Sequence, residues 1–242
     1  MKRALRLRLV FATFWLAAAV SSGGQDVIAT AELNLGISAY KNARYEEAEA
    51  HFLRAVSLDP VAIRPHLYLA TCYAQQYIPG AKVKENDEIG PKAIAEYQKV
   101  IELDANNIDA VKGAAYLYSL MKQQDLAREY YKKVTVLTPN DPEPYYSIAV
   151  MDWTQAYDVR MGARAKLNLK PEFPMIRKEV CWKIQAANQQ VVEDGIEMLS
   201  RALDLRPDYG DAMAYLNLMY RERADIQCGN TQAYESDIQN GR

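Results

Sequence analysis

Side chains that commonly carry out acid–base or metal chemistry are scarce in this sequence of 242 residues. The only two histidines, His51 and His66, do not lie at a spacing typical of metal ligands. Neighbouring carboxylates such as Glu46 and Glu47 are typical of helix N-termini, where the helix dipole favours negative charge. No glycine-rich loop has the spacing that holds a phosphate group. We therefore expect no catalytic site, no bound cofactor and no metal ion, and we predict that the protein is not an enzyme.

The N-terminus has the three-part layout of a secretory signal peptide. Four cationic residues lie within residues 1–8, an apolar run follows from Leu9 to Val20, and small residues come next. This run is shorter than a transmembrane helix requires. We expect residues 1–24 to be cleaved and the bacterial protein to be exported, most simply to the periplasm. The alternative is an uncleaved N-terminal segment that anchors the chain to the inner membrane.

The composition is that of an ordered chain with a mildly acidic surface. Half of the residues are hydrophobic, a quarter are charged, and the net charge is -2. Cleavage of residues 1–24 would remove four positive charges and no negative ones, which changes the net charge to -6. Because nucleic acids and anionic lipids bind basic surfaces, we expect neither as a partner. We also expect no membrane span in the mature chain.

Three cysteines are the remaining reactive groups. No C-x-x-C spacing occurs, so the sequence indicates neither a zinc site nor a redox pair. Cys72 falls on a helix face that is expected to be interior, where a small apolar thiol is ordinary. Cys181 and Cys228 are the candidate disulfide pair, because an oxidising compartment permits such a bond.

A period of about 34 residues organises the chain from Ala29 onward. With Ala29 at position 1, positions 7, 8 and 11 carry leucine, glycine and alanine on a first helix. Positions 20, 24, 27 and 32 carry alanine, phenylalanine, alanine and proline on and after a second helix. Small residues at positions 8 and 20 let two antiparallel helices cross closely, and Pro60 stops the second helix. One helix pair cannot bury its apolar face alone, which predicts an array of pairs.

This pattern resembles the tetratricopeptide repeat, and the resemblance implies an all-α, right-handed solenoid of helix-turn-helix units over residues 25–242. Residues 29–62 and 108–141 fit the period without gaps. Residues 63–107 fit if an insertion separates the two helices, since Ala93 rather than residue 82 takes position 20. The inserted residues, around residues 77–91, are rich in turn formers and charge, so we expect a surface loop, with a ligand-binding loop as the alternative.

The second half of the chain follows the period less well. We expect a degenerate repeat at residues 142–175, with a turn before a weak second helix from about Asp158 to Leu169. We expect another at residues 176–209, with a turn near residues 188–190 and with Gly195, Leu199 and Ala202 at positions 20, 24 and 27 of its second helix. The alternative is an irregular helical insertion between Tyr157 and Gln190.

Residues 210–242 provide an incomplete last unit. Cys228, Gly229 and Asn230 are typical of a helix stop, and the polar residues after them have little apolar periodicity. We therefore expect the second helix of this unit to be missing or very short. Apolar residues of its first helix, Leu216 and Met219 among them, would then be uncovered and available to a partner or a second copy.

The tetratricopeptide family binds ligands in a groove lined by positions 2, 5, 9, 12 and 13 of the first helices. The resemblance carries these positions over to Leu33, Ile37, Lys41, Arg64, Lys112, Tyr116, Tyr146, Trp153 and Arg221. Tyrosine, tryptophan and arginine are enriched at binding hot spots, which favours Tyr116, Tyr146 and Trp153. The alternative for Leu33 and Ile37 is a place in the core, and Trp153 could instead fill a gap beside the weak repeat.

Family members that clamp the C-terminal carboxylates of heat-shock chaperones use lysine and asparagine where this chain has Leu33 and Ile37. The resemblance therefore implies a more apolar, extended or helical ligand. We predict a non-enzymatic scaffold that binds a protein or peptide. One alternative is an assembly module that forms a homo-oligomer through its uncapped C-terminal edge. Another is an accessory domain of an enzyme system.

Overall fold

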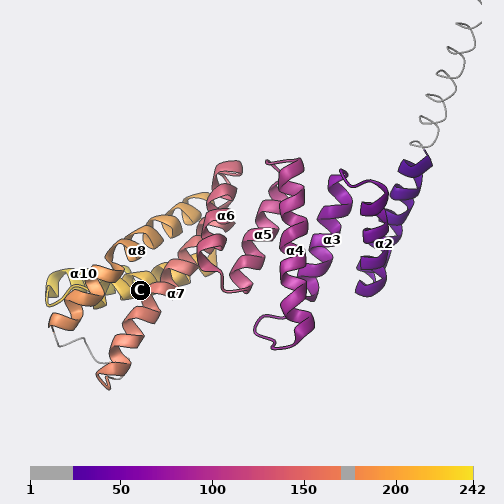
Figure 1. Ribbon diagram of the computed structural model, residues 1–242. Helices are drawn as coiled ribbons and strands as arrows, with labels where there is room; N and C mark the ends of the chain where they lie inside the picture. The colour runs from indigo at the N-terminus through magenta and orange to yellow at the C-terminus, as the bar shows by residue number, and fades with distance from the viewer. Residues whose placement is uncertain (1–23, 170–177, 242) are drawn as a thin grey trace, which may run out of the picture. The chain divides into compact units, whose positions relative to one another are not determined.

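The structure, a computed structural model, describes residues 24–169 and 178–241 (Figure 1). These residues form α-helices joined by turns, which confirms the predicted all-α class. The chain divides into two compact units, unit 1 up to Gln123 and unit 2 from Gln124. Residues 1–23, on which nearly all of the predicted signal peptide falls, lie outside the described part, as do residues 170–177.

Unit 1 is built from helices that pack against their neighbours in chain order. Its first described helix covers residues 24–41 and is followed by α2 (Tyr45–Leu58), α3 (Ile63–Gln76), α4 (Lys84–Leu103) and α5 (Ile108–Leu120). Helix α3 packs against both α2 and α4, and α4 packs against α5 (Figure 1). The helices therefore alternate as first and second members of the predicted pairs.

The first pair shows why the repeat needs small residues at the helix crossing. A Cβ atom placed on Gly36 would lie 2.5 Å from the ring of Phe52, which is closer than carbon atoms can approach. Phe52 itself is fully buried on α2, together with Ala48 and Ala55, which lie about one turn before and one turn after it. Glycine at position 36 thus makes room for the ring that fills the space between the helices.

The insertion in unit 1 is only partly a loop. We predicted a surface loop for the whole of it, and this prediction is wrong for its second half, because α4 begins at Lys84 and continues through Pro91. Asn86 explains the early start. Its side chain, only 6% exposed, donates hydrogen bonds to the carbonyl oxygens of Ile78 and Ala81 and accepts one from the amide of Ile78. These bonds tie the short remaining loop to the first turn of the helix.

Unit 2 also consists of helices, two of which are long. They are α6 (Gln124–Leu137), α7 (Pro142–Lys166), α8 (Lys178–Leu205), α9 (Gly210–Asp225) and α10 (Thr231–Asn240). Helix α7 packs against α6, α8 and α9, and α9 also packs against α8 and α10. The core of this unit is formed mainly by α7, α8 and α9 and includes Val192, Leu199 and Met219.

Helices α7 and α8 contradict the two degenerate repeats that we predicted. Each runs unbroken through a predicted turn, α7 past Tyr157 and α8 past residues 188–190. We predicted a turn at Asn188, but this residue is 1% exposed and donates a hydrogen bond of 2.8 Å to the carbonyl oxygen of Ala156 on α7. The two glutamines after Asn188 donate to carboxylates four residues further along, which supports a continuous helix.

Residues 142–166 and 178–205 therefore form one helix pair with long arms. We predicted that Gly195, Leu199 and Ala202 belong to a repeat at residues 176–209, but they lie on the second helix of the pair that begins at Pro142. Gly195 is a small residue where α8 meets both of its neighbours, because a Cβ atom there would collide with the side chain of Met219 on α9 and lie 3.2 Å from the Cβ atom of Asp152 on α7.

The C-terminal edge is covered, contrary to our prediction. Helix α10 packs on α9, and Met219 is fully buried rather than exposed. The contact is polar: the buried carboxylate of Asp237 accepts hydrogen bonds from Arg223 at 2.8 Å and from Gln227 at 2.6 Å. A helix docked through a carboxylate leaves no apolar pattern in the sequence, which is why we predicted it to be missing or very short.

Candidate functional site

The predicted groove residues of unit 1 differ in their solvent exposure. Tyr116 on α5 has 59% of its side chain exposed, and Lys41 and Arg64 are also exposed. Ile37 is half-buried. Leu33 is only 5% exposed, so it lies in the core, which is the alternative that we gave for it.

The structure brings two of these residues together. Leu33 and Arg64 line one pocket of about 400 Å³ between the first helix of unit 1 and the start of α3. Lys112, on α5 with Tyr116, is half-buried.

In unit 2, Tyr146 and Trp153 belong to an unbroken row of aromatic rings, which we call the aromatic series. In order, it contains Tyr209, Tyr146, Tyr215, Trp153 and Tyr157, and neighbouring ring centroids lie 5.0, 5.7, 5.4 and 5.0 Å apart. The pairs are tilted, edge-to-face or stacked, which are the favoured arrangements of aromatic rings.

The long helix α7 positions three of these rings on one face. Tyr146, Trp153 and Tyr157 are separated by whole numbers of turns, so their side chains point to the same side of the helix. Tyr215 lies on α9, and Tyr209 directly precedes that helix. All of the series except Tyr209 is half-buried, which leaves part of each of the other rings at the surface.

An arginine covers each end of the aromatic series. The guanidinium carbon of Arg206 lies 4.4 Å from the ring centroid of Tyr209, and that of Arg160 lies 5.4 Å from the centroid of Tyr157. Arg160 is fixed in place, because its Nε and a terminal nitrogen each donate a 2.6 Å hydrogen bond to Glu222. The protein's own cations therefore cover the two terminal rings.

Several hydrogen-bond donors of the aromatic series are unused. The indole nitrogen of Trp153 is buried and has no hydrogen-bond partner among the described residues. The hydroxyls of Tyr146, Tyr157 and Tyr215 likewise make no hydrogen bond within the described ranges. Burial raises the pKa of Tyr146, so its hydroxyl keeps its proton near neutral pH. The series thus presents partly exposed aromatic rings with three tyrosine hydroxyls, whereas the buried indole nitrogen of Trp153 is not accessible to a ligand.

We did not predict three residues of the aromatic series from the sequence. Tyr157 lies one turn beyond Trp153, and the assumed turn in α7 concealed this relation. Tyr209 donates a 2.9 Å hydrogen bond to Glu143, and Tyr215 lies between two expected groove positions of the last unit. The high number of tyrosines, 17 in the chain, was the signal that could have drawn attention to them.

Arg221, the remaining predicted residue, is exposed on α9 and takes no part in the ring contacts that the structure describes.

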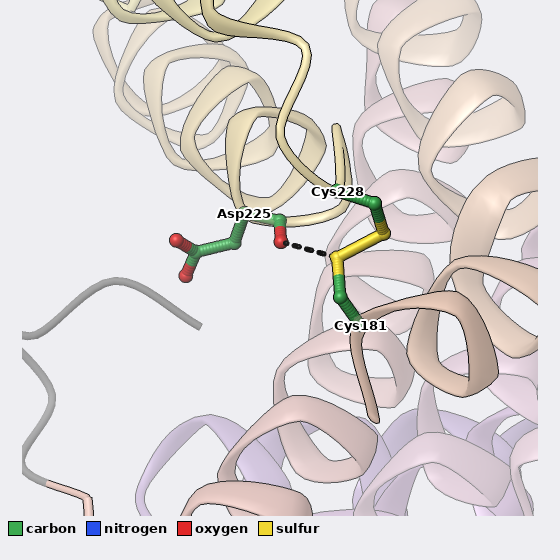
Figure 2. The surroundings of a disulfide bond; sticks show 3 residues. All are labelled: Cys181, Asp225 and Cys228. Atoms are coloured by element: carbon green, nitrogen blue, oxygen red, sulfur yellow. Dashed lines mark hydrogen bonds between the residues drawn. A yellow bond between two sulfur atoms is a disulfide. The ribbon is translucent and has the colours of Figure 1, made fainter. Parts of the chain in front are cut away.

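Beside the aromatic series, a disulfide and buried ion pairs join α7, α8 and α9. The structure joins Cys181 of α8 to Cys228, which follows α9 (Figure 2). The sulfur of Cys181 lies 3.6 Å from the carbonyl oxygen of Asp225. The carboxylate of Asp225 accepts a 3.0 Å hydrogen bond from Arg164, whose side chain is almost fully buried. These links hold the long arms of the α7–α8 pair against α9.

The histidines and the third cysteine have structural roles. The Nδ1 atom of His66 lies 2.5 Å from a carboxylate oxygen of Glu96, and that of His51 lies 2.6 Å from Glu32. Burial raises the pKa of the Cys72 thiol to about 11, which makes it a poor nucleophile near neutral pH. In the part of the chain that the structure describes, no three histidine, cysteine or carboxylate side chains are grouped to hold a metal ion.

None of the described helices combines the length and the apolar composition needed to cross a membrane.

The helix pairs, with small residues at their crossings, define a helical-repeat fold of the tetratricopeptide type. The family model of the tetratricopeptide repeat matches residues 31–61 and 113–141. The chain therefore contains tetratricopeptide repeats over these two ranges, which agrees with the predicted resemblance. Proteins of this family are typically non-catalytic interaction modules.

Solved structures support the same fold at low sequence identity. A crystal structure of MamA is 13% identical, with a TM-score of 0.58 over 88% of this chain and 91% of that chain. MamA from Desulfovibrio magneticus RS-1 is 17% identical, with a TM-score of 0.55 over 88% and 94%. YrrB, described as a tetratricopeptide-repeat protein with an unusual peptide-binding site, is 15% identical, with a TM-score of 0.54 over 91% and 96%. A comparison with curated proteins finds no match.

Proposed function

We propose that this protein is a non-enzymatic scaffold that binds a protein or peptide along the first-helix faces of its repeats. The fold supports a protein–protein interaction scaffold. The observation that carries the finer proposal is the aromatic series, because tyrosine and tryptophan are enriched at binding hot spots and these rings are partly exposed. YrrB, which shares the fold, is described as having a peptide-binding site.

The proposed contact residues are the accessible members of the predicted set. In unit 1 they are Ile37, Lys41, Arg64, Lys112 and Tyr116. In unit 2 they are Tyr146, Trp153 and Arg221. Leu33 is nearly buried, so it contributes by supporting its neighbours rather than by a broad contact of its own.

We further propose that the protein acts in the periplasm. Two observations support this location: the signal-like layout of residues 1–24 and the disulfide between Cys181 and Cys228. Structural disulfides persist in oxidising compartments and are rare in the reducing cytosol. We do not propose an assembly role through an uncapped C-terminal edge, because α10 packs on α9 and Met219 is buried.

Affinity capture with exposed-surface variants tests the scaffold function. Tagged wild-type protein is compared in cells with Tyr116→Ala and with Arg221→Ala, both of which truncate exposed side chains and leave the core intact. The matched control is Glu129→Ala, an exposed residue on α6 outside the proposed surface. We expect the same proteins to be enriched by wild type and control and to be depleted at least about threefold by each variant. Equal enrichment by all four proteins would contradict the proposal.

A further inference from the structure

A groove lies between the arms of α7 and α8, and we call it the arm groove. It has a volume of about 580 Å³. The residues that line it come from α7, its C-terminal cap Leu167 and α8, so no other helix of the described residues closes it. The lining begins at Asp158 and ends at Leu167, which corresponds to about 14 Å along a helix.

The floor of the arm groove is apolar. Val159 and Ala163 lie one turn apart on α7, and Val180 and Ile184 lie one turn apart on α8. Ile184 is 4% exposed and belongs to the core of unit 2, whereas Val159 is 39% exposed. The groove therefore leads from the surface down to the core and offers an apolar strip to the side chains of a ligand.

Gly162 keeps the middle of the arm groove open. It lines the groove on α7, and a Cβ atom placed on it would meet no described atom within 4 Å. Gly36 and Gly195 differ, because neighbouring side chains occupy the space beside them. Glycine weakens a helix interior, and here no side chain of the described residues uses the space that it leaves. A ligand can therefore approach the backbone of α7 closely at this position.

The charges of the arm groove favour an acidic ligand. Lys166 and Lys183 line it, are exposed and form no ion pair within the described ranges. Asp158 is the one carboxylate among the lining residues, so the two lysines and this aspartate give a net charge of +1. The chain as a whole has a net charge of -2, so the groove differs in sign from the rest of the protein. Carboxylates of a ligand would complement the two lysines.

We propose that the arm groove binds an acidic amphipathic helix of a partner protein. Such a helix lays apolar side chains, spaced three or four residues apart, into a groove between two helices. Its carboxylates then face Lys166 and Lys183. This surface adds to the first-helix face proposed above and does not depend on it. Val159 lies two residues beyond Tyr157, which places it on nearly the opposite side of α7 from the aromatic series.

Two other ligands fit the arm groove less well. A basic helix would bring its cations against Lys166 and Lys183. A membrane surface is flat and cannot reach Ile184, which is buried at the floor.

The test is the binding of a fluorescein-labelled peptide of about 14 residues to the full chain, measured by fluorescence anisotropy. The peptide has leucine at every third or fourth position and glutamate and alanine elsewhere. The comparison peptide has lysine in place of each glutamate. We expect saturable binding of the acidic peptide and at least about tenfold weaker binding of the basic one.

Two variants test the floor and the charges separately. Gly162→Leu places an apolar side chain in the open space and should weaken binding of the acidic peptide at least about tenfold. Its melting temperature should not fall, because leucine is the better helix former. Lys166→Glu/Lys183→Glu should reverse the preference, so that the basic peptide binds more tightly than the acidic one.

Lys82→Glu/Lys84→Glu is the matched control for net charge. Both lysines are exposed in unit 1 and lie outside the arm groove. This variant has the same net charge as Lys166→Glu/Lys183→Glu, and it should keep the preference for the acidic peptide.

Three results would overturn the inference. They are equal binding of the two peptides to the wild type, binding of the acidic peptide that Gly162→Leu leaves unchanged, and binding to phosphatidylglycerol vesicles with none to the acidic peptide. The scaffold function is tested apart from this. If the acidic peptide fails to bind while capture yields partners that Tyr116→Ala and Arg221→Ala lose, the inference fails and the first-helix surface stands.

Discussion

Reduction of the disulfide between Cys181 and Cys228 should destabilise unit 2 by an amount that can be calculated from the length of the loop that the bond closes. The bond closes a loop with a sequence separation of 47 residues. Cross-linking a loop of this length removes conformational entropy from the unfolded chain, and the loop-entropy relation gives about 4 kcal/mol for it. The native contacts around the bond, including those of α8 with α9, remain in the reduced protein, so the loss arises mainly in the unfolded state.

The assay is guanidinium chloride unfolding followed by tryptophan fluorescence. Two of the three tryptophans, Trp153 and Trp182, lie in unit 2, so the signal reports mainly this unit. A change of about 4 kcal/mol corresponds to a midpoint shift of about 1–2 M for a unit of this size. A reductant should produce this shift in the wild type. The variant Cys181→Ala/Cys228→Ala should resemble the reduced wild type and should not respond to reductant.

Cys72→Ala serves as the matched control, since Cys72 is a buried free thiol and its variant should still respond to reductant. The reasoning would be refuted if complete reduction, verified by alkylation and mass spectrometry, left the wild-type midpoint where it was.

Three further predictions concern buried charges of unit 2. Glu222→Leu should lower the free energy of unfolding by about 3–5 kcal/mol because Arg160 loses its main partner. Adding Arg160→Met to this variant should restore most of the lost stability. A denaturant titration in which the single and the double variant are equally unstable would contradict this rescue. Burial raises the pKa of Asp152 above its ordinary value of 3.8, so the stability it contributes is present below that value and is lost as pH rises through the raised pKa. The wild type should therefore lose stability relative to Asp152→Asn as the pH rises above 3.8, and a wild type that gains stability relative to this variant over the same rise would exclude this cause. Asp237→Ala should release α10, seen as at least about tenfold faster amide exchange in residues 231–240 with α8 unaffected; unchanged protection would show that other contacts hold the helix.

The repeat period was readable from the sequence because close packing allows few residue types at a helix crossing. Glycine at position 36 and alanine at position 48 are required where Phe52 fills the space between two helices. The same rule identified Gly195 and Ala202 as second-helix residues, although we assigned them to the wrong pair. Packing positions thus revealed which helices exist more reliably than how many residues separate them.

The parts that could not be predicted depend on contacts between residues distant in the sequence. Asn188 indicates a turn by its local preference, but its hydrogen bond to Ala156 makes it a buried helical residue. Helix α10 is held by Asp237 through polar contacts to α9, which no hydrophobic pattern records. Tyr146 and Trp153 were identified as candidate site residues, whereas the contact of Trp153 with Tyr215 required the packing of α9 on α7.

Photo-crosslinking in cells from position 146 tests the central claim most directly. A p-azidophenylalanine in place of Tyr146 keeps the aromatic ring in the series, and the same group in place of Glu129 on α6 provides the control. The proposed scaffold predicts a discrete adduct with one or a few other proteins from position 146 and none of the same adducts from position 129. Identical adducts from both positions, or none from position 146 in cells where the protein is abundant, would contradict binding at this surface.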